Sequence, residues 1–114
     1  MIDLKTKWIC ITVFTASGDT LRELSHEASL LMERKSPLLS GFIEGIVMTN
    51  ETHTELLIVT QWESREAWST HQWDEDVSRS LGEFAQAAMK FEFHAYEPIT
   101  IVRAPATPVS APSP

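Results

Sequence analysis

Residues 56–71 constrain the fold more than any other part of the sequence. The run from Leu56 to Thr60 is apolar or β-branched, which is typical of a buried strand, and the pattern ends in Trp62. Ser64 follows at once and is a good N-cap residue for a short helix from Arg65 to about residue 73. A strand that turns directly into a helix, with large aromatic side chains on both, can line a pocket.

The rest of the sequence alternates between strand and helix patterns. β-branched and aromatic runs predict strands, and apolar residues at every third or fourth position predict helices. Thr20 and Glu23 fit a capping box at the start of the first helix, and Pro37 would stop that helix. Strands are therefore expected at 7–15, 41–49, 54–62 and 91–102, the last ending or interrupted near Pro98, and helices at 20–36, 65–73 and 74–88.

This order, β-α-β-β-α-β with the second helical segment split in two, predicts an α+β ferredoxin-like domain with four antiparallel strands. Helices on one face would leave the other face of the sheet uncovered, with Ile43, Val47, Leu57 and Val59 as its apolar residues. An open apolar face predicts a partner, most simply a second copy of the chain. We expect residues 1–103 to form the domain and the Pro/Ala/Ser-rich residues 104–114 to form a flexible tail.

Composition excludes several classes of partner. The formal net charge is −7 and the nine Lys and Arg residues are scattered, which argues against binding to nucleic acid or to an anionic membrane. The N-terminus does not resemble a signal peptide, and no apolar run is long enough to span a bilayer, so a cytoplasmic location is expected.

Metal and nucleotide sites are also not expected. The four histidines match no recognised metal-binding spacing, and the helical pairs Glu23–His26 and His71–Glu75 are more simply explained as solvated pairs. There is no phosphate-binding glycine loop. The single cysteine, Cys10, lies in a strand pattern and is expected to be a buried, inert thiol.

The candidate site lies around the strand-to-helix turn. Strand alternation places Ile58 and Trp62 on one face, and helical spacing lets Trp68 and His71 share a face. A pocket walled by Trp62, Trp68 and Phe84 would suit a flat aromatic ligand, with His71 as its polar group and as an acid or base. The alternative is that the tryptophans are plain core residues and His71 is an ordinary half-buried helix residue.

The segment Gln61-Trp62-Glu63-Ser64-Arg65-Glu66-Ala67-Trp68, coming off an apolar strand, resembles the hallmark segment of antibiotic biosynthesis monooxygenase domains. The element order of residues 7–100 is also similar. The resemblance implies that two ferredoxin-like subunits join their sheets into a dimeric α+β barrel. Some members of the family oxidise polycyclic aromatic or quinol substrates with O₂ and neither metal nor flavin. Related members degrade haem, and many have no known activity.

The resemblance also implies roles for individual residues. Trp62 matches the strand-end tryptophan that lines the substrate cavity of active members, and Trp68 matches a helix position where some members have tyrosine. Ile58 stands where some cofactor-free oxygenases have asparagine, so one polar anchor is missing. The haem-degrading members of the family use an asparagine on the first strand and a histidine on a later helix. Haem degradation is not expected here, because residues 7–15 contain no asparagine and residues 78–89 contain no histidine.

The leading prediction is a cofactor-independent monooxygenase that acts on a small aromatic or quinol-like compound. His71 would be the catalytic base, and Trp62, Trp68, Ile58 and Phe84 would contact the substrate. The alternative is a non-catalytic small-ligand-binding or stress-associated dimer of the same fold. An isomerase or decarboxylase of the same barrel type is a third possibility.

Overall fold

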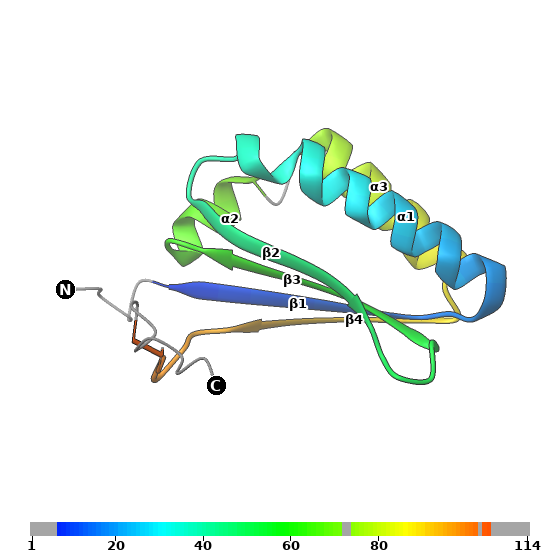
Figure 1. Ribbon diagram of the computed structural model, residues 1–114. Coiled ribbons are helices and arrows are strands. Elements are labelled where there is room, and N and C mark those ends of the chain that lie inside the picture. The colour runs from blue at the N-terminus through cyan, green and yellow to red at the C-terminus, as the bar shows by residue number, and fades with distance from the viewer. Residues whose placement is uncertain (1–6, 72–73, 103, 106–114) are drawn as a thin grey trace, which may run out of the picture.

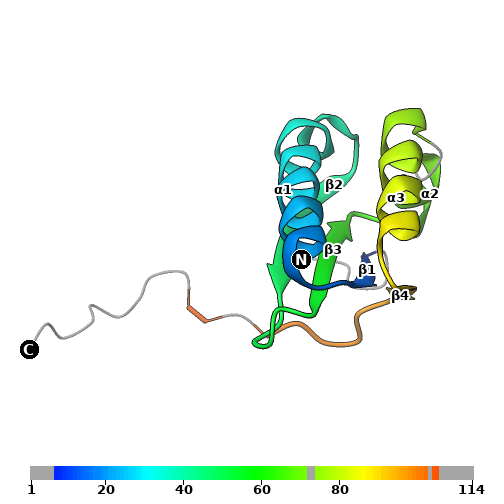
Figure 2. The same ribbon diagram turned by 90° about the vertical axis from the view of Figure 1, so that its right-hand side faces the viewer.

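One four-stranded antiparallel sheet forms the base of the molecule. The computed structural model describes residues 7–71, 74–102 and 104–105. The strands β1 (Trp8–Thr15), β2 (Phe42–Thr49), β3 (Glu55–Trp62) and β4 (Lys90–Tyr96) lie in the order β2-β3-β1-β4. The helices α1 (Gly18–Arg34), α2 (Arg65–His71) and α3 (Glu75–Ala87) cover one face of this sheet, and the short 3₁₀ helix η2 (Ser36–Leu38) follows α1 (Figures 1 and 2). The predicted α+β ferredoxin-like order is confirmed.

The start of α1 differs from the sequence-based expectation. The N-cap is Ser17, its side chain makes no capping hydrogen bond, and the helix begins at Gly18. The predicted capping box of Thr20 and Glu23 is therefore wrong, because both residues already lie inside the helix. Gly18 has a φ of +60°, which glycine adopts without steric strain, and this lets the chain enter the helix soon after β1 ends.

The other boundaries follow the sequence patterns closely. α1 ends at Arg34, shortly before Pro37, which lies in η2. β4 ends at Tyr96, before Pro98, so the segment from there to residue 102 does not continue the strand. The expected end of the second helix at residue 73 and most of the predicted tail lie outside the described residues.

Strand register divides the sheet into two faces. β1 pairs with β3 so that Cys10 lies opposite Thr60 and Thr12 lies opposite Ile58, and all four side chains line the cavity on the helix-covered face. The same face supplies Phe14 and Leu56, which are completely buried. They pack into a core with apolar residues of α1 and α3: Leu21, Leu24, Ala28 and Phe84.

A β-bulge between Phe42 and Glu44 changes which residues of β2 face the helices. The extra residue shifts the alternation by one, so Val47 packs against the hydrophobic core, and its predicted place on the open face is wrong. Ile46 and Met48 lie on the open face instead and are 45% and 42% exposed.

None of the described helices is both long and apolar enough to cross a membrane.

Candidate active site

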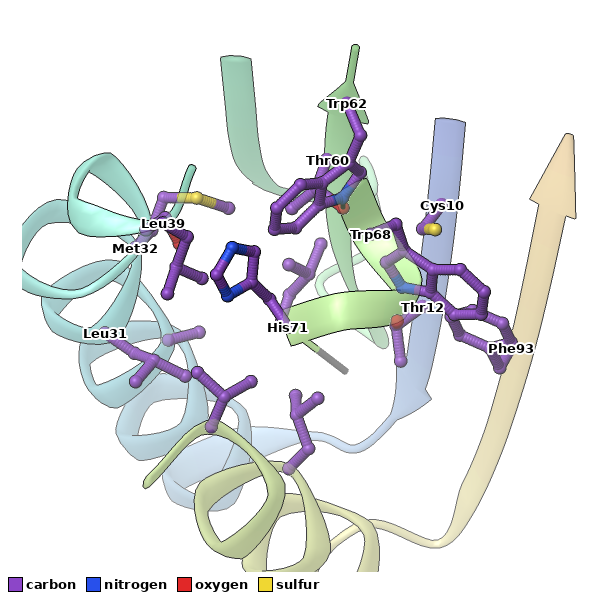
Figure 3. A pocket seen from close by; sticks show the side chains of 15 residues that line it. Cys10, Thr12, Leu31, Met32, Leu39, Thr60, Trp62, Trp68, His71 and Phe93 are labelled. Carbon is purple, nitrogen blue, oxygen red and sulfur yellow. Dashed lines mark hydrogen bonds between the residues drawn. The ribbon is translucent and has the colours of Figure 1, made fainter. Parts of the chain in front are cut away.

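A cavity of about 320 Å³ lies between the helix-covered face of the sheet and the helices. Its floor is formed by side chains of β1, β3 and β4, and its sides by α1, η2, α2 and α3 (Figure 3). The lining is mostly apolar, as in pockets for small organic ligands. Besides the residues discussed below, it includes Leu31, Met32, Leu39, Val77 and Leu81.

Trp62 closes the end of the cavity where β3 ends. The residue is 5% exposed, and its indole N–H donates a hydrogen bond of 3.0 Å to the hydroxyl oxygen of Thr60. One of its contacts is edge-to-face with Phe42, at a centroid distance of 5.6 Å. The other is a stacked contact with His71, at 6.0 Å and an interplanar angle of 23°. These contacts fix the orientation of the indole ring.

The turn after β3 determines where α2 lies. The Ser64 hydroxyl accepts the Ala67 N–H at 3.0 Å, which is the N-cap predicted from the sequence. Gly41 has a φ of +86°, and its carbonyl accepts the Glu63 N–H at 2.8 Å. A Cβ at Gly41 would collide with the side chain of Ala67. The absence of a side chain at Gly41 therefore lets α2 approach the sheet closely.

Trp68 forms a second aromatic wall, on the β1 and β4 side of the cavity (Figure 3). Its ring stacks on Phe93 at 5.9 Å with an interplanar angle of 15° and lies tilted against Trp8 at 6.0 Å. The Arg65 guanidinium lies over the Trp8 ring, 5.6 Å from its centroid.

His71 lies three residues after Trp68, and its imidazole lines the cavity below the Trp62 indole (Figure 3). Within the described residues no group forms a hydrogen bond with this ring. Stacking on Trp62 orients the imidazole but leaves both nitrogens available to a ligand. The arrangement therefore offers a proton acceptor inside a mainly apolar space.

Cys10 also lines the cavity and is 3% exposed. Burial raises the pKa of its thiol to about 11, and interactions with the side chains of Thr60 and Trp8 offset only part of this effect. The Trp8 interaction is weak, since the buried indole N–H of Trp8 has no hydrogen-bond partner of good geometry. Cys10 is thus a neutral thiol at physiological pH, as expected from its strand position.

Asp74 fixes the start of α3 and links it to the end of α1. Its carboxylate accepts the N–H groups of Asp76 and Val77 at 3.1 and 3.2 Å, and lies 3.2 Å from the Lys35 ammonium. The Val77 N–H, more than the Lys35 charge, lowers the pKa of the Asp74 carboxyl. The link holds α3, which carries Val77 and Leu81 into the cavity wall, against the end of α1.

The cavity brings together four of the five residues predicted for the site: Ile58, Trp62, Trp68 and His71. Phe84 is not among them, because its ring packs edge-to-face on Phe14 in the hydrophobic core, at 5.9 Å and 87°. Sequence reasoning missed Thr12, Cys10 and Phe93 as lining residues. Their alternation within two predicted strands was the available signal, but it does not say which face lies above a cavity.

Metal binding receives no support from the described part of the chain, where no three His, Cys, Asp or Glu side chains are grouped so that they could hold an ion. Neither Glu23–His26 nor His71–Glu75 forms an ion pair among the described residues.

Comparison with known proteins identifies the fold. No protein-family model matches the sequence, and no curated protein gives a significant match. Solved structures do match. A monooxygenase from the gene ActVA-Orf6 of Streptomyces coelicolor, in complex with the ligand nanaomycin D, superposes with a TM-score of 0.74 at 18% identity over 90% of this chain and 96% of that chain. The chain shares the fold of antibiotic biosynthesis monooxygenases.

Two further structures of this fold show the same degree of similarity. SnoaB, a cofactor-independent oxygenase from Streptomyces nogalater solved as a mutant, has a TM-score of 0.68 at 10% identity over 87% of this chain and 99% of that chain. The protein PA3566 from Pseudomonas aeruginosa has a TM-score of 0.70 at 17% identity over 86% of this chain and 99% of that chain. At these identities the similarity is one of fold.

Proposed function

We propose that this protein is a cofactor-independent monooxygenase that acts on a small aromatic or quinol-like compound. The observation that carries the proposal is the cavity between Trp62 and Trp68, into which His71 presents a ring without a hydrogen-bond partner in the described structure. Two indole rings suit a flat aromatic ligand, and a histidine can remove a proton from it. The fold shared with two oxygenases, one of them bound to nanaomycin D, supports the same assignment.

In the proposed reaction His71 removes a proton from a CH₂ group activated by a neighbouring phenol or carbonyl. The resulting carbanion donates electrons to O₂, and a C–O bond forms to give a peroxide anion. His71 returns its proton to the terminal oxygen of the peroxide. Loss of water, which takes the second hydrogen of the original CH₂ group, then leaves a C=O group. One oxygen atom enters the product and the other leaves in water, so the substrate supplies all the electrons.

The apolar lining supports this mechanism electrostatically. Burial raises the pKa of Cys10 in the cavity wall, so charge is disfavoured in this space. A substrate anion next to protonated His71 would be poorly solvated and would therefore be a stronger electron donor than in water. The protein's contribution would be a base, orientation of the substrate between the rings, and exclusion of water.

The test is O₂ uptake by the purified, EDTA-treated protein with a panel of anthrones and of other phenols and quinols that carry an activated CH₂ group. We expect uptake above the autoxidation rate, and we expect His71→Gln to lower kcat by roughly 10²–10⁴-fold, as for loss of a general base. His26→Gln, an exposed substitution on α1, is the matched control and should leave the rate unchanged. Equal rates for His71→Gln and the parent protein, or no uptake with any compound, would contradict the proposal.

A non-catalytic ligand-binding protein is the second candidate, and Ile58 favours it. The residue lies in the cavity wall and offers no polar group to a substrate. Under this alternative, aromatic compounds would quench the tryptophan fluorescence by binding, while O₂ uptake stayed at the autoxidation rate. Both measurements on the same compounds therefore separate the two candidates.

We further propose that the protein is a homodimer formed through the open face of the sheet. No described helix covers this face (Figure 2). The strand registers place apolar side chains from three strands on it. They come from Ile9, Ile11 and Val13 of β1, Ile46 and Met48 of β2, and Leu57 and Val59 of β3. Native mass spectrometry should give twice the chain mass, and a monomer at micromolar concentration would contradict this proposal. A cytoplasmic location stays a prediction.

A further inference from the structure

One hydroxyl in the cavity, that of Thr12, has no hydrogen-bond partner among the residues that the structure describes. Thr12 of β1 is 7% exposed, and among the described residues it is the one polar side chain classed as buried. The nearby Thr60 hydroxyl accepts the Trp62 indole N–H, but the described part of the chain offers the Thr12 hydroxyl no hydrogen bond. Among the described residues the fully buried, unpaired side-chain atom is the Trp8 indole nitrogen, so the Thr12 oxygen keeps access to the space of the cavity, where a ligand can reach it. Valine would fill nearly the same space without offering a donor.

The side chains beside Thr12 on the neighbouring strands are apolar. In the strand register Thr12 lies between Ile58 of β3 and Phe93 of β4, and both of these neighbours also line the cavity. Figure 3 shows the Thr12 oxygen and the Trp68 indole nitrogen on the same side of the cavity, toward β4, whereas His71 lies toward α1. The Trp68 N–H likewise has no hydrogen bond within the described residues.

We infer that Thr12 determines ligand specificity: its hydroxyl, assisted by the Trp68 N–H, binds an oxygen atom at the end of the ligand remote from His71. The inference rests on the proposed function, because it assumes that the same cavity holds an aromatic compound. Ile58 provides no polar contact to a ligand. The inference gives this role to Thr12, which lies directly opposite Ile58 on the neighbouring strand.

The chemistry of the site defines the ligand class. A carbonyl or phenol oxygen has lone pairs for both donors, so a compound with oxygen functions at two ends can satisfy Thr12 and His71 together. If the oxygen gains negative charge when His71 removes a proton elsewhere on the ring system, the two donors stabilise that charge. Compounds lacking the second oxygen leave the Thr12 hydroxyl unpaired and should bind more weakly.

The experiment measures Kd by isothermal titration calorimetry for three flat bicyclic probes: 2,6-dihydroxynaphthalene, 2-naphthol and naphthalene. The parent protein should bind the two-oxygen probe roughly tenfold more tightly than the one-oxygen probe, as expected for one additional buried hydrogen bond. Thr12→Val should abolish this gain, and Thr12→Ser, which keeps the hydroxyl, should retain it. Thr15→Val, on the opposite face of the same strand, is the matched control and should leave all three affinities unchanged.

Thermal unfolding supplies a readout that separates a ligand contact from a structural role. Thr12→Val should leave the Tm of the ligand-free protein close to that of the parent, because the described residues give the hydroxyl no hydrogen bond to lose. Any one of three results would overturn the inference. These are a clearly lower Tm for Thr12→Val than for the parent protein, an equal gain in affinity from the second oxygen in both proteins, and no binding of the probes to the parent protein. Oxygen uptake tests the proposed function separately, so its failure is distinguishable from failure of the Thr12 assignment.

Discussion

The reactivity of Cys10 gives a direct measure of the polarity of the cavity. The chain has one cysteine, so any thiol reaction reports on this position alone. Burial raises the pKa of Cys10 from 9.0 to about 11, which lowers the thiolate fraction at neutral pH by about 100-fold. A more basic thiolate is also more nucleophilic, by roughly tenfold over the same interval. The pKa change alone should therefore slow a thiol–disulfide exchange by about tenfold.

The assay is the reaction of the native protein with 4,4′-dithiodipyridine, followed by absorbance, with the same chain in urea as the reference. Because Cys10 is 3% exposed, steric protection should add to the tenfold effect. The rate should continue to rise by about tenfold per pH unit past pH 9, because the thiol titrates only near pH 11. 2,6-Dihydroxynaphthalene should slow the reaction further, since Cys10 lines the cavity. A rate that levels off near pH 9, or that equals the rate in urea, would refute this reasoning.

The same pKa change affects stability with a defined sign. The folded-state pKa of Cys10 is raised, so the stabilisation is complete below pH 9.0 and is lost as the pH rises through about 11. Two pKa units correspond to at most about 2.7 kcal/mol in the free energy of unfolding. Urea titrations of the parent protein and of Cys10→Ala at pH 8 and pH 11 measure this effect. Between the two pH values the parent should lose more stability than Cys10→Ala, and the difference between the two losses is the contribution of the thiol. A parallel pH dependence would show that the Cys10 thiol is not desolvated.

Further predictions concern the backbone and the helix caps. Gly41→Ala should lower the free energy of unfolding by at least about 1–2 kcal/mol, because φ is +86° and the new Cβ meets Ala67, whereas Gly82→Ala in the open interior of α3 should raise it by about 1 kcal/mol. Urea denaturation measures both, and equal effects would contradict the assigned geometry. The pKa of the Asp74 carboxyl is lowered in the folded state, so the ionised carboxylate stabilises the fold. This stabilisation is present above the unfolded-state pKa and is lost as the pH falls through the folded-state pKa. Melting curves between pH 5 and about pH 2.5 should therefore show a smaller decrease in Tm for Asp74→Asn, which keeps a capping oxygen, than for the parent protein.

The element order was predictable because each strand and helix carries its own pattern. The apolar run into Trp62 and the Ser64 cap predicted the strand-to-helix turn, and the structure confirms both. Two local predictions were wrong for physical reasons. A left-handed glycine at position 18 starts α1 earlier than the capping-box pattern of Thr20 suggests, and one bulged residue in β2 exchanges the faces of Val47 and its neighbours.

The site was predictable only where one continuous segment supplies it. Trp62, Trp68 and His71 lie within ten residues of each other, so local spacing was enough to place them together. Thr12 and Phe93 reach the cavity through the pairing of strands distant in sequence, and no local pattern gives that register. Phe84 does not line the cavity for the same reason: helical spacing predicts an inward ring, but only the packing of α3 on Phe14 determines that the ring fills the core.

The pairing of β1 with β3 also makes the cavity easy to redesign. Cys10, Thr12, Ile58 and Thr60 form a compact block of four neighbouring side chains on the cavity floor. Residues one position away along each strand point to the opposite face of the sheet, so substitutions in the block do not alter that surface directly. A combinatorial library limited to these four positions would change the shape and polarity of the floor while leaving the turns and helix caps intact. Such a library offers a route to new ligand preferences within one small scaffold.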